Sequence, residues 1–142
     1  MDMINFLDTA NFKIMQKNLD ILTQRINITG QNIANINTPH YKAKKLEYEN
    51  LFLEKLAALN NSYVLQKRYL GSENKERLQE YLGSVKPKVV TDNVTETKVD
   101  GNNVDIDYEG LELARTQVQY NFMIRKITDE YNLLRYAISE GK

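Results

Sequence analysis

The N-terminal part of the chain carries a heptad pattern of apolar residues. They recur at alternating three- and four-residue steps, interrupted only at Thr29, and comprise Phe12, Met15, Leu19, Leu22, Ile26, Ile33 and Ile36. This spacing is typical of the seam of a coiled-coil helix. A second apolar line lies two positions after the seam, on another side of the same helix, and comprises Ile14, Ile21 and Ile28. Because one partner helix cannot cover both lines, the pattern indicates more than one neighbour.

The C-terminal part repeats this design. One line recurs every seven residues and an adjoining line fills the intervening positions; together they comprise Leu113, Tyr120, Ile127, Leu134, Ile124, Tyr131 and Ile138. An additional apolar line begins at Leu111 and Val118. This helix too is therefore predicted to need neighbours on more than one side.

The ends of the C-terminal helix are marked by capping residues. Asp105 and Asp107 are candidate N-caps, and Gly141 stands where a helix C-cap is expected. The predicted helix covers about residues 108–139 and is about 48 Å long at about 1.5 Å per residue. Such a helix is too long for a compact domain of 142 residues.

The middle of the chain follows other patterns. Leu46, Leu53 and Leu56 predict a short amphipathic helix, and residues 72–83 predict a second one. The β-branched residues of 85–99 predict a small hairpin, with strands at 89–91 and 94–97 and a turn at Asp92 and Asn93.

These patterns predict a mainly α protein. Its two long terminal helices are expected to form a coiled-coil hairpin, with a middle segment of short helices and a small β-hairpin. We divide the chain into an N-terminal helix and turn at 1–43, a variable and partly flexible middle segment at 44–104, and a C-terminal helix at 105–142.

Charge and composition exclude several functions. The chain has 19 Lys plus Arg and 19 Asp plus Glu, so no net charge favours binding to nucleic acid or to an anionic membrane. It has no Cys for a disulfide, a thiolate nucleophile or a zinc–thiolate site. The N-terminus has acidic residues where a secretory signal has basic ones, and no apolar segment reaches the roughly 20 residues of a membrane span.

Two segments are candidate chemical sites. His40 is the one histidine and follows Pro39 in a predicted turn, where a surface position is the simpler interpretation. Residues 105–110 resemble the first half of a calcium loop, but Thr116 stands where such a loop has its bidentate Glu. Helix capping explains these carboxylates better. We therefore predict no catalytic residue, no metal ligand and no cofactor.

Two asparagines stand inside the apolar stripe of the first helix. A buried amide must find hydrogen-bond partners, and in a coiled coil it fixes the register at some cost in stability. We interpret Asn32 and Asn35 as register or backbone-capping residues for the end of this helix. The alternative is that both amides are exposed at a fraying helix end.

Two segments carry a family resemblance. The Asn32-Ile33-Ala34-Asn35 core, followed by Thr38-Pro39-His40-Tyr41-Lys42, resembles the N-terminal signature of flagellar rod and hook proteins. That signature usually has glycine at the position of His40, and histidine can follow a positive φ angle there at modest cost. The segment Asp100-Gly101-Asn102-Asn103-Val104-Asp105, with the long helix after it and the ending Ala137-Ile138-Ser139-Glu140-Gly141-Lys142, is similar to the proximal rod proteins in particular.

The resemblance implies a structural subunit of the flagellar basal-body proximal rod, not an enzyme, which assembles by coiled-coil packing of its terminal helices and transmits torque in motility. It implies type III export without a cleaved signal to the periplasmic side of the basal body. The implied partners are copies of the chain, other rod subunits, the basal-body membrane ring, the hook-basal-body adaptor protein and the export gate.

We predict that the assembly interface comprises Phe12, Met15, Leu19, Leu22, Ile26, Asn32, Ile33, Asn35, Leu113, Tyr120, Ile124, Ile127, Tyr131, Leu134 and Ile138. The alternatives are another flagellar rod subunit, a coiled-coil adaptor or export chaperone, and a small enzyme or calcium-binding module.

Overall fold

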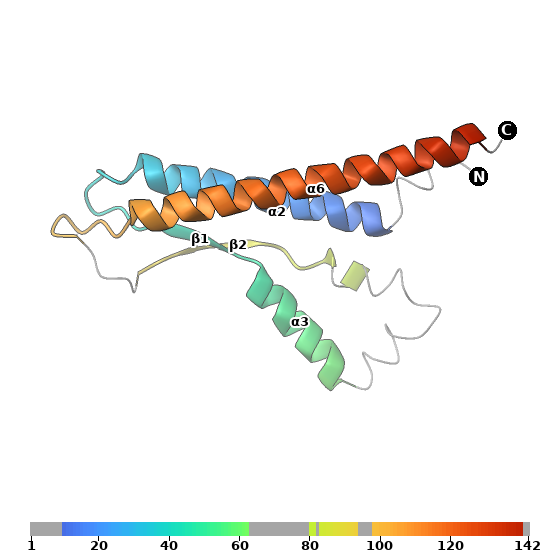
Figure 1. The fold of residues 1–142 in the computed structure, drawn as a ribbon. Coiled ribbons are helices and arrows are strands. Elements are labelled where there is room, and N and C mark those ends of the chain that lie inside the picture. Colours follow the sequence, from blue (N-terminus) through green and yellow to red (C-terminus); the bar gives the residue numbers. More distant parts are fainter. Residues whose placement is uncertain (1–9, 63–79, 82, 94–97, 141–142) are drawn as a thin grey trace.

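Two long helices dominate the structure. The computed structural model describes residues 10–62, 80–81, 83–93 and 98–140. Helix α2 (Ala10–Ala34) and helix α6 (Ile106–Glu140) lie side by side and run in opposite directions (Figure 1). The prediction of a mainly α protein with a long helix near each end is confirmed.

The two helices differ in length. Helix α2 has 25 residues and α6 has 35, which correspond to about 37 Å and about 52 Å at about 1.5 Å per residue. Asn32, near the C-terminal end of α2, contacts Glu109 in the first turn of α6. The C-terminal end of α2 therefore lies beside the N-terminal end of α6. None of the described helices combines the length and apolarity needed to cross a membrane.

Helix α2 is covered on two sides. Its buried apolar residues are Ile21, Leu22 and Ile28, which come from both apolar lines of the sequence. Helix α6 packs against one side of α2, and strand β1 (Lys44–Glu47) packs against another. Both apolar lines thus contribute buried residues, and α2 has two neighbouring elements within the same chain. Thr29, which interrupts the seam, is itself only 5% exposed.

The inner face of α6 differs from the prediction. Ile124, Tyr131 and Ile138 are 40%, 58% and 51% exposed, so the line chosen as the companion of Leu113, Tyr120 and Ile127 does not face α2. The more buried companion line lies four residues before Leu113, Tyr120 and Ile127. It comprises Glu109, Thr116 and Met123. Because Glu109 and Thr116 are polar, the pattern of apolar residues did not identify this side of α6 as the buried one.

The small sheet also differs from the prediction. Strand β2 (Lys88–Thr91) pairs antiparallel with β1, in a register that places Lys44 opposite Thr91 and Leu46 opposite Val89. The described pairing is thus made between distant segments and not within a local hairpin, because a short strand needs an apolar surface to rest on and β1 lies on α2. The predicted second arm at 94–97 lies outside the described residues.

The other middle elements are placed as follows. Helix α3 (Glu49–Asn61) confirms the predicted short helix around Leu53, but Leu46 belongs to β1 and not to that helix. Helix α3 points away from the pair of long helices (Figure 1). Most of the second short helix predicted at 72–83 lies outside the described residues.

Candidate functional site

A cluster of buried asparagines joins the long helices to the strands. Asn32 is 1% exposed, Asn102 is 0% exposed and Asn103 is 8% exposed. We call these three residues, together with Glu109, the asparagine joint. Buried amides need hydrogen-bond partners, and in the described part of the chain no buried side-chain nitrogen or oxygen lacks one.

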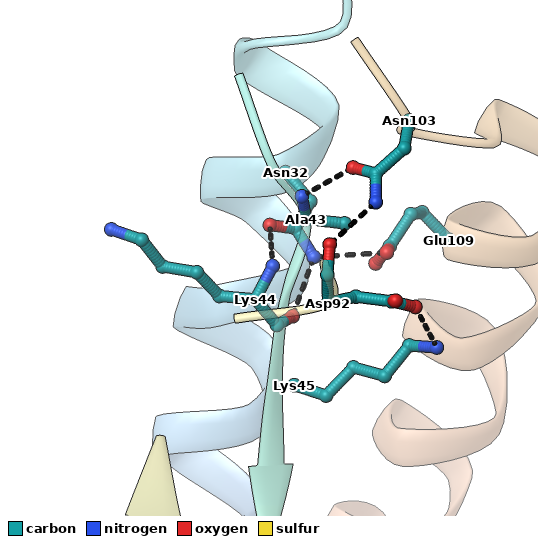
Figure 2. Close-up of polar contacts among 7 residues, drawn as sticks. All are labelled: Asn32, Ala43, Lys44, Lys45, Asp92, Asn103 and Glu109. Atoms are coloured by element: carbon teal, nitrogen blue, oxygen red, sulfur yellow. Dashed lines mark hydrogen bonds and ion pairs between the residues drawn. The ribbon is translucent and has the colours of Figure 1, made fainter. Parts of the chain in front are cut away.

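Asn32 links three segments. Its Nδ2 donates to the backbone carbonyl of Lys44 at 2.8 Å and to Oε1 of Glu109 at 2.9 Å. Its Oδ1 accepts from the backbone N–H of Lys44 at 3.0 Å and from the hydroxyl of Tyr41 at 3.1 Å. The side chain thus bonds strand β1 as a neighbouring strand would, while it also holds the first turn of α6 (Figure 2). The interpretation of Asn32 as a register residue gains a structural basis, although its partners lie beyond the helix end.

Asn103 closes one end of the sheet. Its Oδ1 accepts from the backbone N–H of Ala43 at 2.6 Å, and its Nδ2 donates to the backbone carbonyl of Asp92 at 2.7 Å. The N–H of Asp92 donates to the carbonyl of Ala43 at 2.8 Å. Because Ala43 precedes β1 and Asp92 follows β2, Asn103 ties the loop before α6 to both strands (Figure 2).

Asn102 holds the turn that follows α2. Its Nδ2 donates to the backbone carbonyls of Asn35 and Thr38, each at 2.9 Å, and its Oδ1 accepts from the N–H of Val104 at 2.7 Å. Asn35 is partly buried and its Nδ2 donates to the carbonyl of Gln31 at 2.7 Å, which is the helix-end capping expected of it. The turn after the Asn-Ile-Ala-Asn segment is therefore fixed by the Asp100–Val104 loop.

Asp105 caps helix α6. Its Oδ1 accepts from the N–H groups of Asp107 at 2.9 Å and Tyr108 at 3.2 Å. This confirms capping as the role of Asp105, while Asp107 lies within the first turn, where a negative charge suits the helix dipole. Among the described residues, no group of three or more His, Asp or Glu side chains is arranged to hold a metal ion.

His40 and Gly101 face each other across this turn. His40 has φ 60° and Gly101 has φ 78°, so both residues adopt left-handed backbone conformations. The N–H of His40 donates to the carbonyl of Asp100 at 3.0 Å. A Cβ atom on Gly101 would lie 2.7 Å from Nδ1 of His40. His40 thus adopts the positive φ that histidine can follow at modest cost, and position 101 needs glycine for two separate reasons.

We expect Gly101→Ala to destabilise the chain by about 2 kcal/mol, because an L side chain in the left-handed region costs roughly 1–2 kcal/mol and the new Cβ also meets His40. In a His40→Gly background the same substitution should cost less, because the contact is gone and only the backbone cost remains. Urea unfolding of the four proteins measures both costs. Equal costs in the two backgrounds would show that the His40 ring does not oppose the new Cβ.

Charged residues surround the joint in pairs. Lys45 Nζ lies 2.9 Å from Asp92 Oδ2, and Arg115 lies 3.5 Å from Glu112, while Arg25 pairs with Glu49. All of them except Asp92 line a polar cleft of about 480 Å³ between α2, β1 and α6. A second groove of about 590 Å³ is mostly apolar, and its lining includes Ile21, Leu22, Val118, Phe122 and Met123.

The predicted interface residues divide into three groups. Leu22 and Asn32 are buried in the chain itself. Those that are partly buried are Phe12, Met15, Leu19, Ile26, Ile33, Asn35, Leu113, Tyr120 and Ile127. Ile124, Tyr131 and Ile138 are exposed, and the side chain of Leu134 lies outside the described part of the structure. Their role in assembly stays a prediction.

Residues outside the predicted set complete the site. Asn102, Asn103 and Glu109 were not predicted as site residues, although Asn102 and Asn103 lie within a segment that resembles the proximal rod proteins. The available signal was two adjacent amides just before a strong helix cap at Asp105. Among the described residues, these three side chains form hydrogen bonds to backbone groups or to other residues of the joint, so the arrangement defines an architectural site.

Similar proteins point to one class. No protein-family model matches the sequence. The chain is 32% identical over 111 residues to "Flagellar basal body rod protein FlgB" of Bacillus subtilis (strain 168), a match that covers 78% of this chain and 79% of that protein. It is 36% identical over 110 residues to the protein of the same name from Borreliella burgdorferi, covering 74% and 78%. For Buchnera aphidicola the identity is 28% over 127 residues, covering 89% and 92%.

These relatives are rod proteins of the flagellar basal body, the class that the Asn-Ile-Ala-Asn segment indicates. Within that class the chain belongs to the FlgB family. This assignment disfavours the alternatives of a different rod subunit, an export chaperone and a small enzyme or calcium-binding module.

Proposed function

We propose that this chain is a structural subunit of the proximal rod, without catalytic activity, that assembles through its terminal helices and helps to transmit torque. Its proposed partners are copies of itself, other rod subunits, the basal-body membrane ring, the hook-basal-body adaptor protein and the export gate. The proposed route is type III export without a cleaved signal, to the periplasmic side of the basal body. The family assignment supports a rod subunit, and the surface of α6 supports assembly through helices.

The observation that carries the proposal is the apolar surface of α6. One side of α6 carries three exposed apolar residues, Leu111, Val118 and Phe122, which their spacing places together. They are 68%, 69% and 65% exposed. Ile124, Tyr131 and Ile138 form a second exposed line with a strict seven-residue repeat. Large exposed apolar patches on a protein surface mark interaction sites. Two separate lines on one helix suit a packing in which several neighbours surround each subunit.

Coiled-coil packing of these lines follows from their spacing. A seven-residue repeat keeps apolar side chains facing a partner helix along the whole length. A contact made between two different surfaces of identical subunits extends into a helical assembly unless the rotation closes it into a ring. We assign the line of Ile124, Tyr131 and Ile138 to such contacts between subunits.

We expect Ile124→Asp to abolish swimming while the protein is still secreted. A carboxylate placed in a contact between subunits costs about 3 kcal/mol or more at each buried copy. In the isolated chain Ile124 is 40% exposed, so folding should change little. The measurement compares swimming with the amount of subunit in the culture medium, and circular dichroism checks the helix content of the purified variant.

Asn121→Asp is the matched control, because Asn121 is exposed on the same helix and receives the same new charge. We expect this strain to swim. If the Ile124→Asp strain also swims normally, the line of Ile124 is not an assembly contact and this part of the proposal is wrong.

A further inference from the structure

One buried acid in the asparagine joint forms no ion pair with any residue in the described part of the chain. Glu109 is 4% exposed, and it accepts a hydrogen bond from Nδ2 of Asn32 at 2.9 Å. None of the ion pairs found among the described residues includes Glu109. Removing a carboxylate from water is costly unless a charge partner and several hydrogen bonds compensate. Here an uncharged amide takes the place of a cation.

The neighbouring charges do not supply that cation. From β1, the positive charge of Lys45 acts on Glu109, but its Nζ bonds Asp92 at 2.9 Å. From α2 and α6, Arg25 and Arg115 border the same cleft and pair with Glu49 and Glu112. The other ionisable groups around Glu109 are Lys44 of β1, Tyr41 before it, and Asp105 and Tyr108 at the start of α6.

These surroundings disfavour the ionised carboxyl. Burial raises the pKa of Glu109, the hydrogen bond from Asn32 and the charge of Lys45 lower it, and the negative charges of Glu112 and Asp105 raise it again. The net pKa lies above the ordinary value of a glutamate. For an acid with a raised pKa, the stabilisation is present below the unfolded-state pKa and is lost as pH rises through the folded-state pKa.

The hydrogen bonds of the joint tolerate protonation. A protonated Glu109 retains an oxygen that can accept from Asn32, so the links from Asn32 to Lys44 and Tyr41 need not change. Protonation removes the cost of the buried charge and weakens the hydrogen bond from Asn32 and the attraction to Lys45, and burial is the largest of these effects. We propose that Glu109 makes the asparagine joint responsive to pH. The contacts that the joint makes between α2, β1 and α6 are more stable when this carboxyl is protonated, and they break more readily when it is ionised.

The amide hydrogen of Lys44 reports on this opening, because it is bonded to Oδ1 of Asn32. Native-state hydrogen exchange is measured by NMR on the full chain from pH about 4, below the ordinary pKa of a glutamate, to about 8, and each rate is divided by that of an unstructured peptide at the same pH. One titrating group changes the protection by at most about tenfold per pH unit. We expect the protection of Lys44 to increase several-fold as the pH is lowered.

Two Glu→Gln variants show whether Glu109 or a neighbouring carboxylate causes the pH dependence of Lys44 protection. Glu109→Gln keeps an acceptor for Asn32 and removes the charge, so the dependence of Lys44 protection on pH should disappear. Glu112→Gln, one turn further along α6, removes a carboxylate that pairs with Arg115 and should keep most of that dependence.

A flat profile in the natural chain would overturn the proposal, as would an unchanged slope in Glu109→Gln. A Glu109→Gln chain that fails to fold would overturn it too, because the neutral side chain is expected to hold the joint. The measurement uses the isolated subunit, so failure of the proposed assembly would not affect it.

Discussion

Asn102→Asp is expected to destabilise the folded chain by about 3–5 kcal/mol, the typical cost of an unpaired buried charge. The two side chains have nearly the same shape, so packing is preserved. Nδ2 of Asn102 donates to the carbonyls of Asn35 and Thr38, and a carboxylate oxygen in its place would repel both. The turn after α2 should open, and unfolding in urea should begin at a much lower concentration.

The new carboxylate should also make stability depend on pH. Protonation removes the charge and restores one donor, so part of the lost stability should return as the pH is lowered. Asn37→Asp is the control, since Asn37 is exposed in the same turn and should tolerate the change within about 0.5 kcal/mol. Similar unfolding midpoints for the two variants would mean that Asn102 does not hold the turn.

Asn32→Ala is expected to cost about 4 kcal/mol or more, since each buried polar group left without a partner costs about 1–3 kcal/mol. The substitution removes partners from the N–H and carbonyl of Lys44, from the hydroxyl of Tyr41 and from Glu109. Contacts of β1 and α6 with the end of α2 should be lost together. Urea unfolding followed by circular dichroism measures the loss.

Asn27→Ala provides the comparison on the same helix. Asn27 is exposed, and alanine has the higher helix propensity, so this variant should be as stable as the natural chain or slightly more stable. If Asn32→Ala loses less than about 1 kcal/mol, water replaces the amide without penalty and the joint is not the main link between the segments.

The long helices could be predicted because their signal is local. The apolar spacing from Phe12 to Ile36 and the cap at Asp105 both operate within one or two turns, and the structure confirms α2, α6 and the capping role of Asp105. The left-handed conformation of His40 agrees with the glycine that is usual at that position in the proteins that the segment resembles.

The inner face of α6 could not be predicted from apolarity alone. Glu109 and Thr116 are 4% and 1% exposed, but neither is apolar, so Ile124 seemed the better seam residue. Thr116 satisfies its hydroxyl by donating to the carbonyl of Glu112 at 2.7 Å, one turn back, which makes a polar residue acceptable in a packed face.

The asparagine joint and the sheet depend on segments far apart in the chain. Strand β2 has the β-branched residues of a strand, but nothing in its own sequence identifies β1 as its partner. Asn103 bonds one residue before β1 and one after β2, so its role depends on a pairing that the sequence pattern did not indicate. The resemblance of the segment from Asp100 to Asp105 and its two adjacent amides pointed to this region, but not to the strands that Asn103 joins.

The separation of the bonded residues sets an order of events during folding. Asn32 and Glu109 are 77 residues apart, Asn102 and Asn35 are 67 apart, and Asn103 and Ala43 are 60 apart. Contacts that close such long loops carry an entropy cost that local helix formation does not. Helix α2 can therefore begin to form early, but its buried amide has no partner on α6 until the far end of the chain is free to return. A chain that is synthesised or transported from its N-terminus cannot complete these bonds until Glu109 is also free to fold.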